Sequence, residues 1–221
     1  HPDLLRGLTH KLNNLLAVIQ GFSSLELMNE DLDPGVTENV QHIREASVNV
    51  SSLSERIRSA GGCAKVSPQP INPGDYLAAI EGSIREPFTK AGVQLDVEVQ
   101  PGLPSILVDP SKFKDIMVEL VKNAAEAAQK GGGRALVKIC GPGVITPAEQ
   151  RRVDILVSNT GSQIPPDKLQ DVFRPFQGSK NSNHLGLGLT IAAMLSHQMS
   201  LQLGVGSENN TTTFWLSCPV A

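Results

Sequence analysis

The sequence predicts an α+β protein in two parts: a two-helix hairpin that dimerises into a four-helix bundle, followed by an α/β sandwich lobe. Apolar residues near the N-terminus recur at helical spacing in two segments separated by a turn. A stretch rich in glycine and proline follows, and beyond it strand patterns alternate with helical ones. We therefore divide the chain into a hairpin at 1–62, a linker at 63–72 and a lobe at 73–221.

Composition narrows the classes of partner. The 221 residues carry a formal net charge of -3 and no run of Lys or Arg, so nucleic acid is not an expected partner. No apolar run approaches the roughly 20 residues of a membrane span, so this segment is not expected to contact a membrane. Cys63, Cys140 and Cys218 form no CxxC pattern, which favours free thiols in the cytoplasm over a disulfide framework or a zinc site. The chain begins at His1 without a methionine, so we expect a fragment whose parent could be membrane-anchored.

The hairpin is predicted from periodicity and capping residues. Asp33 and Pro34 are suited to start the second helix, and Gly61 and Gly62 to end it. Each helix also carries apolar residues beyond one stripe, so pairing two hairpins into a bundle, as a homodimer, would bury them. The apolar seam of the first helix alternates steps of three and four: Leu5, Leu8, Leu12, Leu15, Ile19 and Phe22.

The lobe is predicted to place one sheet against several helices. Asparagine or aspartate followed by proline marks two helix starts, and β-branched residues mark the strands. The expected helices are Asn72 to about Lys90, Asp109 to about Lys130 and one from about Leu187, and the expected strands are 93–99, 135–140, 152–159, 201–206 and 211–219.

The first group of candidate functional residues lies on the first helix. His10 and Asn14 are one helical turn apart, and Gly7, Ala17 and Gly21 leave that face open to a docking partner. Because His10 lies off the apolar seam, its imidazole is expected to reach solvent, where it can act as a nucleophile or a general base. From this residue alone, an ordinary surface histidine is the better interpretation.

A second group lies on the predicted helix from Asp109. Glu119 and Asn123 are again one turn apart, and small residues follow Asn123. A carboxylate and an amide oxygen can hold a hydrated Mg²⁺ that in turn holds phosphates. A solvated helix face is the alternative.

Two further groups lie at a strand end and before the last helix. The amide of Asn159 could pair with a base edge, and Gly161 would let a flat ring approach the backbone. Gly186 and Gly188 precede a helix whose free N–H groups could bind an anion. Each of these two groups alone is also typical of a loop. The order and spacing of all four groups along the chain make their combined signal stronger than any one of them.

Together these segments resemble the catalytic core of a sensor histidine kinase, in which a dimerisation and phosphoacceptor hairpin precedes an ATP lobe of the gyrase, heat-shock chaperone, histidine kinase and MutL superfamily. The resemblance covers nearly the whole chain. Its boxes are, in order, THKLNNLLAVIQG, DPSKFKDIMVELVKNAAEAA, SNTGSQIP, FRPF, LGLGL and TTTFWLSCP.

The resemblance implies a function as well as a fold. His10 would receive the γ-phosphoryl group of ATP and pass it to an aspartate on a response-regulator receiver domain. Asn14 would support dephosphorylation of that receiver. Asn123, with Glu119 beside it, would hold Mg²⁺, and Lys180 with the glycines would form the lid over the phosphates.

Several residues depart from the family pattern. Lys11 stands where an acidic residue usually orients the histidine and accepts its proton. Asn159 replaces an aspartate that accepts from the adenine amino group, which would weaken binding by roughly 1 to 2 kcal/mol. Gln163 and His184 replace glycines and add bulk where close backbone approach is expected.

Two alternatives to an autokinase remain. One is a degenerate core that acts as a phosphotransfer or docking scaffold, or as a receiver phosphatase, without effective ATP binding. The other is a chaperone or topoisomerase ATPase, in which the glutamate activates water. The helical hairpin with His10 argues against the second.

Overall fold

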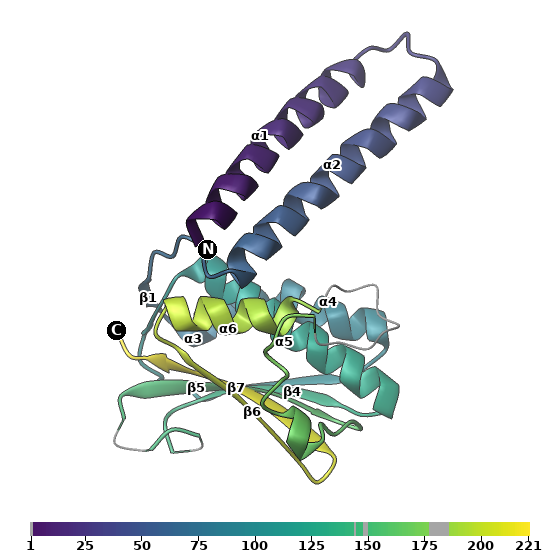
Figure 1. The fold of residues 1–221 in the computed structure, drawn as a ribbon. Helices are drawn as coiled ribbons and strands as arrows, with labels where there is room; N and C mark the ends of the chain where they lie inside the picture. Colours follow the sequence, from purple (N-terminus) through teal and green to yellow (C-terminus); the bar gives the residue numbers. More distant parts are fainter. Residues whose placement is uncertain (1, 144, 148–149, 177–185) are drawn as a thin grey trace. The chain divides into compact units, whose positions relative to one another are not determined.

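The computed structural model of the chain describes residues 2–143, 145–147, 150–176 and 186–221. The chain forms two compact units, His1–Ala64 and Lys65–Ala221. The first is a helical hairpin and the second an α/β lobe, as the sequence predicts (Figure 1).

The hairpin consists of α1 (Pro2–Glu26) and α2 (Pro34–Ala60), which run antiparallel side by side (Figure 1). The carboxylate of Asp33 caps α2 by accepting from the backbone N–H of Gly35 at 2.8 Å. Pro34 occupies the first turn, where its missing N–H costs nothing. The predicted start of the second helix is therefore confirmed.

The face that α1 turns toward α2 differs from the predicted seam. Leu15 and Phe22, two seam residues, are 65% and 67% exposed in the single chain. Leu16, which the sequence places beyond the seam, is 6% exposed, and Thr9 and Ser23 are buried with it. The hairpin thus packs through a second stripe about a quarter turn away, and leaves the longer apolar stripe uncovered within one chain.

The contact between α1 and α2 is largely polar. The Asn13 amide donates to Glu55 at 3.1 Å, and the Gln20 amide donates to the hydroxyl of Ser51 at 3.1 Å. The buried hydroxyl of Ser23 donates to a carbonyl of its own helix. Since such contacts bury little apolar surface, the hydrophobic effect contributes little to pairing within the hairpin.

The lobe contains two sheets, four helices and one 3-10 turn among its described residues. Their bounds are β1 (Gln69–Ile71), α3 (Pro73–Ala79), α4 (Glu81–Ala91), β2 (Leu95–Val99), β3 (Ile106–Val108), α5 (Pro110–Gly131), β4 (Ala135–Cys140), β5 (Arg152–Thr160), η1 (Pro166–Lys168), α6 (Gly188–Gln198), β6 (Gln202–Glu208) and β7 (Thr211–Pro219).

The five-stranded sheet has the order β2-β4-β5-β7-β6. Only β2 and β4 pair in parallel; the other neighbours are antiparallel. Helices α4, α5 and α6 cover one face of this sheet (Figure 1). The core between the layers includes Ile84, Phe88, Ile116, Leu120, Ile155, Val157, Leu195, Phe214 and Leu216.

Three local features differ from the sequence prediction. The expected single helix from Asn72 is interrupted at Ile80 and forms α3 and α4. Strands β1 and β3 were not predicted, because three-residue strands are too short to show a period. Within the predicted linker 63–72, residues 69–71 form β1, and the division between the units falls at Ala64.

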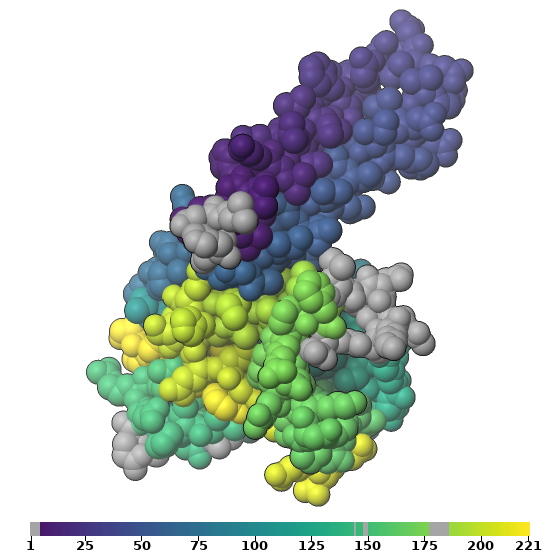
Figure 2. All heavy atoms as spheres, viewed as in Figure 1, coloured from purple at the N-terminus to yellow at the C-terminus, as the bar shows by residue number. Residues whose placement is uncertain are grey.

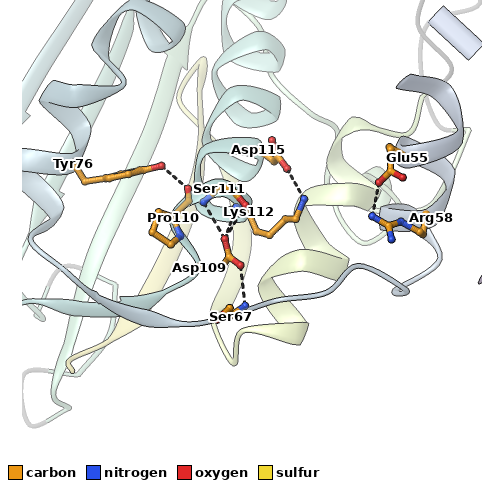
Figure 3. A network of polar contacts seen from close by, with 9 residues as sticks. All are labelled: Glu55, Arg58, Ser67, Tyr76, Asp109, Pro110, Ser111, Lys112 and Asp115. Atoms are coloured by element: carbon orange, nitrogen blue, oxygen red, sulfur yellow. Dashed lines mark hydrogen bonds and ion pairs between the residues drawn. The ribbon is translucent and has the colours of Figure 1, made fainter. Parts of the chain in front are cut away.

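Asp109 joins several segments of the lobe. Its Oδ1 accepts from the backbone N–H groups of Ser111 at 2.9 Å and Lys112 at 3.1 Å, which caps α5, and its Oδ2 accepts from the N–H of Ser67 at 2.8 Å (Figure 3). The Tyr76 hydroxyl donates to the carbonyl of Pro110 beside it. Burial alone would raise the pKa of Asp109, but the hydrogen bonds from Ser67, Lys112 and Ser111 outweigh it and hold the pKa below its usual range.

Removing this cap should destabilise the lobe. Asp109→Ala is expected to lower the free energy of unfolding at pH 7 by about 1 to 2 kcal/mol, measured by urea denaturation. Because the folded-state pKa is lowered, the contribution is present above the ordinary carboxyl pKa and is lost as pH falls through the folded pKa. The matched variant Asp109→Asn keeps an acceptor and should lose less at pH 7. Equal losses for both variants would contradict the capping role.

Candidate functional site

His10 lies on α1, and its side chain is exposed. The Nδ2 of Asn14, one turn further along, lies 3.4 Å from the Nδ1 of His10. The neighbouring Gly7, Ala17 and Gly21 are exposed as well, so small residues surround the imidazole. The structure therefore places the predicted pair together and open to solvent in the single chain.

The contact with Asn14 controls which imidazole nitrogen is available. An amide that donates from Nδ2 to Nδ1 leaves the proton of neutral His10 on Nε2. An amide turned by half a rotation accepts from Nδ1–H through Oδ1, and the lone pair then lies on Nε2. Lys11 is exposed and offers no acceptor. Asn14 is thus the side chain that can orient His10 in the absence of an adjacent carboxylate.

In the lobe, Glu119 and Asn123 lie on α5 at the edge of its buried face, and both are half-buried. A Cβ built on Gly188 would collide with the carboxylate of Glu119. This close approach brings Glu119 against the first turn of α6, where backbone N–H groups lack helical partners. Two of the predicted groups, far apart in sequence, therefore meet between α5 and α6.

Asn159 lies one residue before the end of β5 and is 1% exposed. It shares the inward face of the strand with Ile155 and Val157. Neither its Nδ2 nor its Oδ1 has a hydrogen-bond partner among the residues that the structure describes. Because a buried polar group without a partner costs about 1 to 3 kcal/mol, this amide is suited to a ligand that supplies the missing partners.

A close backbone contact forms next to Asn159. Gly161 has φ of 92°, and a Cβ on Gly131 at the end of α5 would collide with the Gly161 carbonyl. Only glycine allows both the positive φ and this approach, so the end of α5 packs directly on the turn after β5. Gly131 was not predicted as a site residue, because a glycine near a helix end is already explained by capping. Gln163, one of the departures, is exposed.

The FRPF segment is anchored to the lobe. Phe173 packs edge-on against Phe214, with ring centroids 6.1 Å apart, and its carbonyl accepts from the Thr190 hydroxyl of α6 at 3.0 Å. Residues 161–176, green in Figure 2, lie on the surface of the lobe beside α6. The N–H of Phe176 donates to the carbonyl of Gly186, which has φ of 63°, at 2.9 Å. Lys180 and His184 lie outside the described residues.

The described residues offer a partial set of metal ligands and not a complete one. Across that part of the chain, no group of three or more His, Cys, Asp or Glu residues gathers in a way that could hold a metal ion. A hydrated Mg²⁺ bound partly by phosphates needs fewer protein ligands than an ion held by the protein alone. Asn123 and Glu119 therefore fit a hydrated Mg²⁺ that phosphates also bind. No described helix is both long and apolar enough to span a bilayer.

Comparisons with known proteins agree with this architecture. Over 223 aligned residues the chain is 28% identical to the sensory histidine kinase/phosphatase NtrB of Proteus hauseri; the match covers 99% of this chain and 62% of that protein. The chain therefore spans less than two thirds of that relative.

Two solved structures share the fold. The full-length structure of ShkA in complex with AMPPNP matches with a TM-score of 0.80 and 24% identity, over 100% of this chain and 46% of that one. The histidine kinase ThkA in complex with the response regulator protein TrrA matches with a TM-score of 0.61 and 17% identity, over 99% of this chain and 61% of that one.

The family match concerns the lobe. The family described as histidine kinase-, DNA gyrase B-, and HSP90-like ATPase matches residues 108–221, more than half of the chain. This span runs from the end of β3 to the end of the chain and contains Glu119, Asn123, Asn159, Gly186 and Gly188. The chain therefore belongs to the histidine kinase-, DNA gyrase B- and HSP90-like ATPases, with the architecture of a sensor histidine kinase catalytic core.

Proposed function

We propose that this chain is the catalytic core of a two-component histidine kinase, in which His10 accepts the γ-phosphoryl group of ATP and passes it to an aspartate of a response-regulator receiver. The observation that carries the proposal is an exposed imidazole, oriented by Asn14, in the same chain as a lobe of the ATPase family. A relative of similar architecture is named a kinase and phosphatase, and another was solved with a response regulator.

In the proposed reaction, the lone pair on Nε2 of His10 attacks the γ-phosphorus in line, and the bond to the leaving ADP oxygen breaks. The amide of Asn14 lies against Nδ1 of the ring. Turned so that Oδ1 accepts from Nδ1–H, it stabilises the tautomer that leaves Nε2 unprotonated. Attack by a receiver carboxylate on the phosphoryl group then returns a neutral imidazole. Solvent exposure of His10 lets the lobe and the receiver reach it in turn.

The lobe residues would hold the nucleotide. Asn159 would face the base, and the N-terminus of α6 at Gly186 and Gly188 would bind phosphate oxygens. The close approach that Gly161 permits is made by Gly131 of α5 and not left open for a ring. Lys180 is proposed to close over the phosphates. Bound Mg²⁺, held by Asn123 with Glu119 beside it, would neutralise developing phosphate charge.

We also propose that the chain is a homodimer. The exposed stripe of α1 includes Leu15 and Phe22, while the contact between α1 and α2 is polar, so the apolar surface needs a cover. A second copy supplies an identical stripe and completes a four-helix bundle. The three free cysteines are buried, which suits the reducing cytoplasm in which we place the reaction.

A charge within the stripe should prevent dimerisation. Leu15→Glu is expected to convert the dimer into a monomer in sedimentation equilibrium, because two carboxylates would be buried at the symmetric contact. Asn39→Glu, which adds the same charge at an exposed position of α2, is the control and should leave the dimer intact. A wild-type chain that sediments as a monomer would contradict the bundle.

A second candidate function is a degenerate core that acts as a scaffold or a receiver phosphatase without effective ATP binding. It is favoured by the His10 contact, which comes from an amide and not from a carboxylate that could accept the proton. Incubation of the chain with γ-labelled ATP and Mg²⁺ separates the two functions. An autokinase acquires acid-labile label; a scaffold acquires none and shows no saturable binding at millimolar nucleotide.

The phosphatase activity has its own test. Asn14→Ala should slow the loss of phosphate from the phosphorylated receiver by about 100-fold, because the amide that positions the attacking water is gone. The measurement follows the labelled receiver over time with the variant in excess, and Asn39→Ala serves as the matched exposed control. An unchanged rate would mean that Asn14 is merely a solvated neighbour of His10.

A further inference from the structure

Asn159 presents an unusual group for the interior of a sheet. Its amide has one donor atom and one acceptor atom, and both lack a partner among the described residues although the side chain is 1% exposed. The missing partner must therefore offer an acceptor and a donor side by side. The inward neighbours on the same strand, Ile155 and Val157, are apolar and offer neither.

The neighbouring strands do not satisfy the amide either. In the sheet register, Asn159 lies between Ala135 of β4 and Thr212 of β7. Alanine has no side-chain polar atom, and the Thr212 hydroxyl is engaged with the Ser162 carbonyl at 3.0 Å and the Ser207 hydroxyl at 2.8 Å. No described side chain therefore fixes which amide atom lies on which side, and half a rotation about the last torsion exchanges them.

From this we propose, resting on the nucleotide site argued above, that Asn159 accepts both 6-amino and 6-oxo purine nucleoside triphosphates. The adenine edge presents a donor at N6 and an acceptor at N1. A 6-oxo purine presents the reverse, an acceptor at O6 and a donor at N1. The amide can pair with either edge through two hydrogen bonds, after turning over for the second.

An isosteric carboxylate would behave differently. The side chain produced by Asn159→Asp would have acceptors only, so it would accept one hydrogen bond from either edge, from N6 of adenine or from N1–H of a 6-oxo purine. In each case its second oxygen would face a repelling acceptor, N1 of adenine or O6 of the 6-oxo purine. The amide is thus the feature that lets either edge form two hydrogen bonds. This specificity belongs to one side chain and requires no other change in the lobe.

The test compares ATP with inosine triphosphate, which carries a 6-oxo purine without a 2-amino group. Equilibrium dialysis with labelled ATP and Mg²⁺, competed by each unlabelled nucleotide, gives both dissociation constants. We expect the two to agree within about fivefold for the wild-type chain, and Asn159→Asp to weaken both by about tenfold or more, because each base loses one hydrogen bond and gains a repelling contact. Asn49→Asp, the same change at an exposed position of α2, should leave both constants unchanged.

The outcomes separate this inference from the proposed function. A wild-type chain that binds ATP but not inosine triphosphate overturns the inference and leaves the nucleotide site standing, as does an Asn159→Asp variant that keeps both affinities. A chain that binds neither nucleotide overturns both proposals. If Asn159→Asp fails to fold, Asn159→Ala decides: both affinities should fall together by about tenfold or more, and unchanged affinities exclude Asn159 from the base contact.

Discussion

Replacing His10 with alanine is expected to abolish the incorporation of label from γ-labelled ATP. The methyl group of alanine has no lone pair to attack phosphorus, and no other group can take over the reaction at that position. Since His10 is exposed on α1, the variant should fold and dimerise as the wild-type chain does. The measurement is acid-labile label per chain after incubation with Mg²⁺ and ATP.

The hairpin provides a control for this variant. His42 is an exposed histidine on α2, and His42→Ala should retain full labelling. Binding of ATP by His10→Ala should also be unchanged, since the residues that we propose bind the nucleotide all lie in the lobe. Label that persists in His10→Ala would show that another residue is the phosphoacceptor and that the assignment of His10 is wrong.

The second large effect is expected at Asn123. Asn123→Ala should weaken ATP binding in the presence of Mg²⁺ by about 10- to 100-fold, because it removes the amide oxygen that we propose interacts with the metal or its water, and bonds to charged groups are the stronger ones. Autophosphorylation should fall with it. Titration calorimetry with ATP measures the affinity, first with Mg²⁺ and then with a chelator.

The chelator shows whether the loss is specific to the metal. Without Mg²⁺, wild type and Asn123→Ala should bind ATP equally weakly. Gln129→Ala removes an amide from an exposed position on the same helix and should bind as the wild type does. If Asn123→Ala keeps its affinity with Mg²⁺ present, the residue is part of a solvated helix face and not a metal ligand.

Most elements of the fold could be predicted because their signals are local. Asp33, Asn72 and Asp109 each precede a proline, and each caps a helix in the structure. Strand β4 matches its predicted bounds, because its run of mostly apolar residues is a clear strand signal in the sequence. Strands β1 and β3 could not be predicted, since three residues form a strand only when a partner from elsewhere in the chain pairs with them.

The helix contact shows the limit of periodicity. The apolar stripe through Leu15 and Phe22 is the more regular pattern, yet α2 packs on the stripe of Thr9, Leu16 and Ser23. A periodic stripe shows that a face will be covered but not by which helix. Two helices joined by a short turn can meet through small polar residues and keep the apolar face for another chain.

Local spacing in the chain was enough to predict most helices and strands, and to place His10 beside Asn14 and Glu119 beside Asn123, since helical periodicity decides which side chains share a face. Three features of the lobe arise only from its folded arrangement: Glu119 meets the start of α6, α5 ends against Gly161, and Asn159 is buried without a partner among the described residues. The first two are contacts between residues that are distant in the chain. They depend on how the layers of the lobe pack, which no local pattern records.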